Sequence, residues 1–292
     1  MGPTLAISFG AGLASALLFA TFASGSMAAL VLFYFAALPV LIAGLGWGHY
    51  AGAFAAAIGA LALSLAFRSQ FGLFFFFSVG LPAWVLTYAA LSFRPAPTTE
   101  DPDAVEWMPP GILLTMIGGG AVILTLFAII TLYGIDFTAF QTAMRQAVGR
   151  IVAQVRATNA DRDLLVAVMA AAVPVAAAVI WTFVTTINLY VAGRIVRASG
   201  RLVRPWPDLA ALKLPKWTAT ALFVGSVGSF ASGFGGQIAA IILAVGLAVY
   251  ALQGFALAHD ITRGWGMRGF ALGLLYALTF VIGWPMIFVA LA

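Results

Sequence analysis

Apolar stretches of about 20 residues recur along this chain and constrain its fold more than any other feature. A helix rises about 1.5 Å per residue and the hydrocarbon layer of a membrane is about 30 Å thick, so each stretch has the length that crosses a bilayer once. We expect nine spans, near residues 4–22, 28–46, 49–67, 71–92, 112–134, 164–192, 217–235, 238–258 and 270–290. The count becomes eight if one short span enters the membrane and returns.

The composition also indicates a membrane protein. Hydrophobic residues make up 63% of the chain and charged residues only 8%, whereas a soluble domain is usually about a quarter charged. A transmembrane barrel needs strands in which apolar and polar residues alternate, and runs such as 121–131 do not alternate. The predicted fold class is therefore all-α: a polytopic bundle of about eight or nine spanning helices with one interfacial amphipathic helix.

We expect a single integral membrane domain over residues 1–292. Very short links join the first four spans, so residues 1–92 should form a group of four antiparallel helices. Residues 93–111 then form a flexible loop that carries four acids and five prolines. The C-terminal helices occupy residues 112–292, together with two polar segments, 136–158 and 193–216.

Residues 136–158 have the pattern of an amphipathic helix lying along the membrane surface. Their apolar residues recur at helical spacing, while the glutamines and arginines fall largely on other faces. The apolar set is Phe137, Phe140, Met144, Val148, Ile151 and Val155. Asp161 stands where the next span begins, and a carboxylate there can cap the free backbone donors of a helix start.

Residues 193–216 form the most basic link, and they contain one acid, Asp208. Basic residues concentrate in the cytoplasmic loops of membrane proteins, so this link predicts the orientation. With nine spans, the N-terminus is cytoplasmic and the C-terminus external. We expect anionic lipids or partner proteins at the basic side chains, which are Arg194, Arg197, Arg201, Arg204, Lys213 and Lys216.

The motifs of enzyme chemistry are largely missing. The absence of cysteine excludes disulfides, thiol nucleophiles and cysteine-ligated metals. The chain has no GxxxxGK[ST] phosphate loop, and His49 and His259 lie far apart without a metal-binding motif. All nine acids lie in links or at span ends, which argues against proton-driven transport, although backbone carbonyls can still bind sodium. We expect no catalytic residue, metal or cofactor.

The span 164–192 is the most polar of the nine. Trp181, Thr185 and Asn188 share one helical face, and Pro174 frees a backbone carbonyl earlier in the span. This face either binds a small solute, with Trp181 stacking and Asn188 hydrogen-bonding, or joins a neighbouring helix. Gln253, His259 and Asp260, at the end of the eighth span, either form a hydrogen-bond cluster at the helix end or belong to a binding site.

Small residues and prolines within spans predict how the helices pack. Small residues recur at four-residue spacing in two sets, Gly48, Gly52 and Ala56, and Gly225, Ser229 and Gly233. Such stripes let helix backbones approach closely. Pro39, Pro82 and Pro285 predict kinks or irregular turns.

A set of short motifs extends over nearly the whole chain. They are Leu38-Pro39 with residues 44–48, Gly80-Leu81-Pro82-Ala83-Trp84, residues 188–196, residues 204–209 with Leu214-Pro215, and residues 253–256 with His259. These residues resemble the YybS-like family of bacterial polytopic membrane proteins, a domain of unknown function. The resemblance implies a multi-pass protein of the bacterial inner membrane. That family is distantly similar to the substrate-binding subunits of energy-coupling-factor transporters, which pair with separate ATPases and a coupling subunit.

Two functions follow from these patterns. The first is a transport-related subunit without its own ATPase, which binds a small organic solute in the helix bundle and associates with ATPase or coupling subunits. Its binding residues are Trp181, Thr185, Asn188 and Gln253. The alternative is a membrane scaffold or assembly protein of the cell envelope that recruits partners through residues 193–216. Neither is an enzyme, and nucleic acid is not an expected partner.

Overall fold

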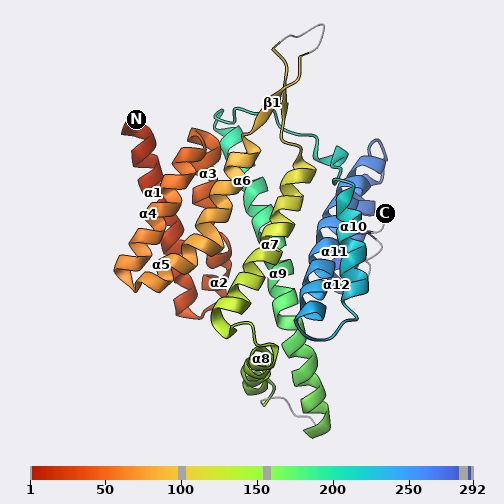
Figure 1. Cartoon of the computed structure of the whole chain (residues 1–292). Coiled ribbons are helices and arrows are strands. Elements are labelled where there is room, and N and C mark those ends of the chain that lie inside the picture. Colours follow the sequence, from red (N-terminus) through yellow and green to blue (C-terminus); the bar gives the residue numbers. More distant parts are fainter. Residues whose placement is uncertain (1, 98–102, 154–158, 283–288, 291–292) are drawn as a thin grey trace. The chain divides into compact units, whose positions relative to one another are not determined.

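The computed structural model describes residues 2–97, 103–153, 159–282 and 289–290, and helices dominate it (Figure 1). The chain divides into two compact units, which we describe separately. The first comprises Met1–Ile117 and Val184–Leu209, and the second Gly118–Phe183 and Ala210–Ala292. Helices α7 (Pro110–Tyr133) and α9 (Asn159–Ala198) contribute to both. The all-α fold class is confirmed, and a single membrane domain stays a prediction.

The first unit is built around four apolar spans. Its elements, besides the start of α7 and the end of α9, are α1 (Gly2–Ala20), η1 (Thr21–Ser24), α2 (Met27–Tyr34), α3 (Leu38–Trp47), α4 (His49–Ala66), α5 (Ser69–Phe75), η2 (Phe76–Gly80), α6 (Leu81–Ala90), β1 (Phe93–Pro95) and β2 (Val105–Trp107). Helix α4 packs against α1, α3, α5 and α6. A Cβ on Gly52 of α4 would lie 3.1 Å from the Cα of Gly44 in α3, which confirms the predicted close packing at Gly52, whereas a Cβ on Gly48 would meet no atom within 4 Å.

Two of these spans contain a break. The second span is interrupted at residues 35–37, between α2 and α3, just before Pro39. The fourth contains the π-helical η2, which ends before Pro82. Because proline lacks a backbone N–H and crowds the preceding turn, irregular structure at both positions agrees with the expected kinks. Pro285 lies outside the described residues.

The link after the fourth span contains a hairpin where we expected a flexible loop. Strands β1 and β2 pair antiparallel, with Phe93 opposite Trp107 and Arg94 opposite Glu106. The guanidinium of Arg94 lies 2.6 Å from the Glu106 carboxylate, and the rings of Phe93 and Trp107 are 5.2 Å apart. Cross-strand pairs of this kind stabilise short antiparallel strands.

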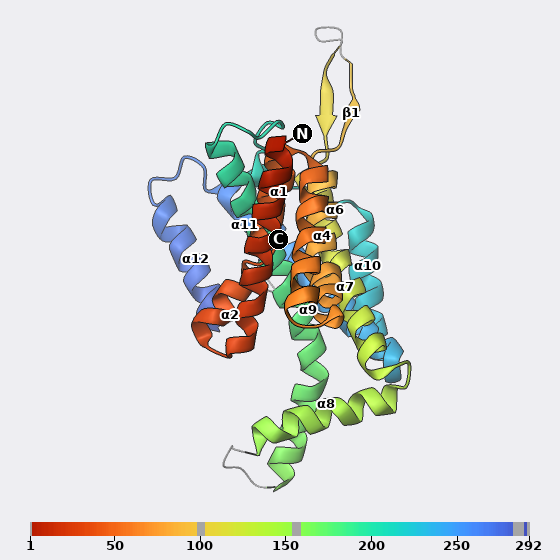
Figure 2. The ribbon, with the colours of Figure 1, turned by 90° about the vertical axis from the view of Figure 1, so that its left-hand side faces the viewer.

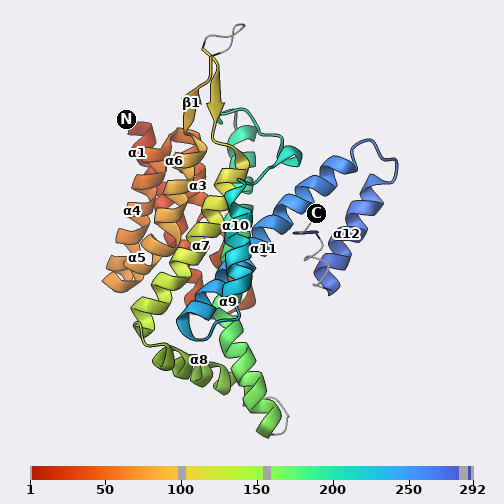
Figure 3. The same cartoon turned by 45° about the vertical axis from the view of Figure 1, so that its right-hand side comes forward.

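The second unit holds the remaining helices. Besides its parts of α7 and α9, these are α8 (Phe137–Val152), α10 (Trp217–Gly228), α11 (Gly233–Ile261) and α12 (Arg268–Ile282). Helices α10 and α11 form a tight hairpin (Figure 3). A Cβ on Gly225 would lie only 2.9 Å from the backbone nitrogen of Leu243, which confirms close packing at this small residue.

Helix α8 confirms the predicted amphipathic helix over 137–152, and residues 154–158, with Val155, lie outside the described residues. Figure 2 shows α8 running across the N-terminal part of α9. Val148 and Val152 pack there against Ala170. The Asp136 carboxylate caps α8 by accepting hydrogen bonds from two backbone N–H groups. Helix α9 begins at Asn159, so Asp161 lies in its first turn, and its role as a cap stays a prediction.

Among the described residues, seven helical stretches are long and apolar enough to cross a membrane. The expected span at 217–235 is shorter, because α10 ends at Gly228 and α11 begins at Gly233, whose φ of 72° suits glycine. The described part of α12 has 15 residues. The backbone N–H of Leu214 donates to Gln253 Oε1 at 3.0 Å. Gln253 lies about 12 Å along the helix axis before the end of α11. The link that precedes α10 is therefore bound to α11 at Gln253.

Candidate functional site

The polar face of α9 is used in contacts within the protein. Asn188 is 1% exposed, and its Nδ2 donates to the carbonyl of Tyr34 at 2.8 Å and to that of Val184 at 2.8 Å. This bond connects α9 to α2, as expected if the polar face joins a neighbouring helix. Thr185 is buried, in the first unit. Trp181 belongs to the second unit, where its ring lies close to Gly120 of α7.

Gln253, the fourth residue predicted to bind a solute, has a structural contact. It lies on α11 in the second unit, and its side-chain oxygen accepts the hydrogen bond from Leu214. The four predicted solute-binding residues are therefore not gathered around one cavity within either unit.

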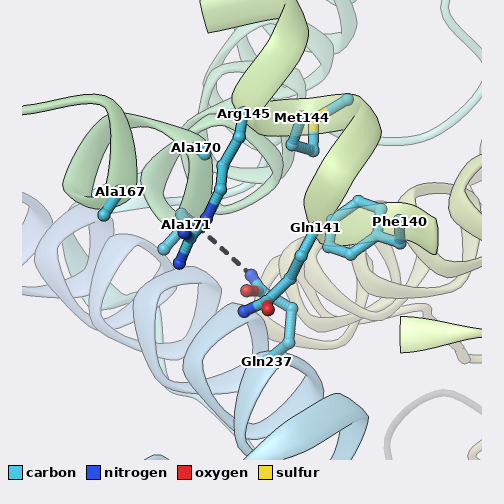
Figure 4. A pocket seen from close by; sticks show the side chains of 8 residues that line it. All are labelled: Phe140, Gln141, Met144, Arg145, Ala167, Ala170, Ala171 and Gln237. Atoms are coloured by element: carbon cyan, nitrogen blue, oxygen red, sulfur yellow. Dashed lines mark hydrogen bonds between the residues drawn. The ribbon is translucent and has the colours of Figure 1, made fainter. Parts of the chain in front are cut away.

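A small cavity lies among α8, α9 and α11 of the second unit (Figure 4). Its lining residues are Phe140, Gln141, Met144, Arg145, Ala167, Ala170, Ala171 and Gln237. Its volume is about 30 Å³, whereas pockets for organic ligands usually hold about 300–1,000 Å³. Gln237 Nε2 already donates to the Ala171 carbonyl at 3.3 Å. This cavity has room for water and not for a metabolite.

The basic segment has a more distinctive geometry. Helix α9 continues to Ala198, so Arg194 and Arg197 lie on its final turns, where the negative end of the helix dipole favours cations. Their guanidinium carbons lie 5.9 and 5.4 Å from the ring centre of Trp206. Arg201 lies 4.6 Å from the ring centre of Trp47, at the end of α3. All three arginines are exposed.

We call these five residues, Arg194, Arg197, Arg201, Trp47 and Trp206, the arginine–tryptophan surface. All five belong to the first unit. A guanidinium over an aromatic face is attracted by the ring and keeps its N–H groups at the edge of the stack. Those groups can bind a carboxylate or phosphate with two parallel hydrogen bonds.

Arg204 corrects the prediction that every arginine of this segment contacts lipid or a partner. Its side chain is buried, and its guanidinium donates to the carbonyls of Ala90 at 2.9 Å and Met108 at 3.1 Å. Burial lowers the pKa of Arg204, although an arginine stays charged at neutral pH. The residue fixes the segment after α9 to α6 and to the residue that follows β2. Lys213 and Lys216 are exposed, in the second unit.

The tryptophans of this surface were not among the residues predicted from the sequence. Trp206 lies two positions after Arg204, within the basic segment, so the sequence alone could have placed it near the arginines. Trp47 lies more than 150 positions before Arg201, so only the fold brings them together. Among the described residues, no group of three His, Cys, Asp or Glu side chains is placed to hold a metal ion.

The comparisons with known proteins give one match. A family model described as "Predicted membrane protein (DUF2232)" matches residues 13–292. No curated protein and no solved structure matches the chain.

Proposed function

The chain belongs to a family of predicted membrane proteins, DUF2232, and we propose that it is a membrane scaffold or assembly protein that recruits an acidic partner protein at the cytoplasmic face. The arginine–tryptophan surface carries this proposal. Its three exposed guanidinium groups lie over two tryptophan rings and are not consumed by ion pairs with neighbouring acids in the described residues. As a multi-pass membrane protein, the chain also contacts the lipid bilayer.

The residue types at this surface suit protein recognition. Arginine and tryptophan are enriched among the residues that dominate binding energy at protein interfaces. Val203 lies in the same segment and is 75% exposed, which places an apolar side chain among the charged ones. An acidic segment of a partner can bind the guanidinium groups while an apolar group covers Val203.

The first unit supports a cytoplasmic position for this surface. Arg201 contacts Trp47, and Arg204 bonds to Met108, so the links after the second, fourth and sixth spans lie at one end of the unit. That end carries five arginines, Arg94, Arg194, Arg197, Arg201 and Arg204. On the other side of the membrane, the link after the third span carries Arg68 and the link after the fifth span carries Arg145, Arg150 and Arg156. Because basic residues concentrate on the cytoplasmic side, this excess supports a cytoplasmic position for that end, with the N-terminus on the cytoplasmic side of a bacterial inner membrane.

Anionic lipid headgroups compete with an acidic partner protein for the same three guanidinium groups. Each basic residue near an anionic leaflet gains about 1 kcal/mol from it, so three arginines attract lipid without any partner protein. The decisive distinction is whether a protein contacts this surface in the native membrane.

Photo-crosslinking from position 203 tests the proposal. A photoreactive amino acid replaces Val203, and adducts are collected from native membranes. We expect a protein adduct that decreases at least about tenfold when Arg194, Arg197 and Arg201 are all changed to glutamine. The matched control changes Lys213 and Lys216 to glutamine and should leave the adduct intact. Adducts to lipid alone, or equal loss in the control, would contradict recruitment of a protein.

A transport-related role is the second candidate, and a break in a membrane span favours it. Discontinuous spans often form the substrate and ion sites of transporters, and the second span is interrupted at residues 35–37 beside Asn188. The YybS-like family that the sequence resembles is distantly similar to the substrate-binding subunits of energy-coupling-factor transporters, which suits this role with partner ATPases and a coupling subunit. Thermal stabilisation of the purified protein by a metabolite would support it. A screen without a stabilising solute, alongside a responsive control transporter subunit, would count against it.

A further inference from the structure

The break between α2 and α3 exposes backbone carbonyls inside a membrane span. The N–H of Leu38 donates to Phe35 instead of Tyr34, so the Tyr34 carbonyl loses its usual helical partner. Asn188 Nδ2 bonds to it instead. The hydroxyl of Ser15, on α1, donates to the carbonyl of Ala36. Side chains from two neighbouring helices therefore converge on this break.

Each of these carbonyls retains acceptor capacity. A carbonyl oxygen has two lone pairs, and the bonds from Asn188 and Ser15 use one on each. The break lies between the C-terminal end of α2 and the N-terminal end of α3, whose opposite partial charges offset each other. The attraction for a cation therefore comes from the carbonyl oxygens themselves.

Asn188 adds an acceptor that has no partner. Its Nδ2 donates to two carbonyls, which fixes the orientation of the amide, because a flipped amide would set oxygen against oxygen. Its Oδ1 is fully buried and accepts no hydrogen bond from any residue that the structure describes. A buried acceptor of this kind normally has a water, an ion or a ligand as its partner.

We propose that the break and Asn188 form a binding site for a small monovalent cation. Asn188 Oδ1 and the carbonyl oxygens of Tyr34 and Ala36 supply neutral oxygen ligands, as unwound spans do for sodium. Divalent cations favour carboxylates, and no acid occurs between residues 1 and 99. The site uses residues of the first unit only and is independent of the scaffold proposal.

Ion-dependent unfolding tests this site. The purified protein is heated in detergent with NaCl, KCl or choline chloride at equal concentration. We expect the unfolding midpoint to rise saturably with Na⁺ relative to choline, because an ion that binds only the folded state stabilises it. Equal midpoints in all three salts would overturn the proposal and leave a buried water as the partner of Asn188.

Variants of Asn188 locate the ion. Asn188→Leu should abolish the rise above its own choline baseline. Asn188→Gln keeps the amide but displaces it, and should weaken the apparent Na⁺ affinity at least about tenfold. Thr182→Val is the matched control, because the Thr182 hydroxyl bonds to Ala178 of its own helix, so the response should persist. An unchanged Na⁺ response in Asn188→Gln would contradict the site, even if Asn188→Leu fails to fold.

Discussion

At the scale of single residues, arginines of one short segment have different roles. Arg194 lies exposed beside an aromatic ring, whereas Arg204 is buried and bridges two backbone carbonyls. A buried charged group must keep its hydrogen bonds, because an unsatisfied partner inside the protein is costly. The same side chain therefore stabilises the fold at one position and remains available for binding at the other.

Arg204→Gln should destabilise the protein by about 1–3 kcal/mol, since it leaves the carbonyls of Ala90 and Met108 without their charged donor. Arg194→Gln, at an exposed position, should change stability by less than about 0.5 kcal/mol. Chemical unfolding in detergent measures both. Equal effects of the two substitutions would contradict the structural role of Arg204.

These roles mark the limit of what the sequence predicted at this scale. The basic cluster was identifiable from charge alone. The burial of Arg204 depends on Ala90 and Met108, which lie about 100 positions earlier, and no local pattern records that contact. For Asn188, solute binding and contact with another helix both stayed open. The sequence shows which helical face carries Asn188, but it does not show which helix packs against that face.

At the scale of elements, helices were predicted better than their interruptions. Hydropathy over a window of about 20 residues is a local property, and so is the amphipathic pattern of α8. The β1–β2 hairpin was missed because its few residues form strands only through the pairing of Arg94 with Glu106 and Phe93 with Trp107. The short α10 was missed because hydropathy stays high through residues 229–232, where the helix ends before α11 begins at Gly233, whose φ is positive.

Close packing of α10 on α11 gives a prediction at this scale. Gly225→Ala should destabilise the protein by about 1–3 kcal/mol, because the new Cβ would overlap the backbone of Leu243, which cannot move independently. Gly119→Ala on α7 meets no atom within 4 Å and should be neutral or stabilising by up to about 1 kcal/mol, from helix propensity. Thermal unfolding compares them; a stable Gly225→Ala protein would mean that the two helices separate more easily than their contacts indicate.

At the scale of the whole molecule, the account depends on orientation. Hydropathy identifies spans without saying which end is cytoplasmic, and only the distribution of arginines carries that information. The contacts of Arg201 and Arg204 gather three links of the first unit at its arginine-rich end. Recruitment of a cytoplasmic partner requires that this end face the cytoplasm.

Cysteine accessibility at Ser199 measures that orientation directly. The chain has no cysteine, so Ser199→Cys introduces a single exposed thiol beside the arginine–tryptophan surface. Ser24→Cys, at an exposed residue that ends η1 and the first span, is the control for the opposite face. We predict that a membrane-impermeant thiol reagent labels Ser24→Cys in intact cells and labels Ser199→Cys only after the membrane is opened. Labelling of Ser199→Cys in intact cells, with Ser24→Cys protected, would contradict a cytoplasmic docking surface.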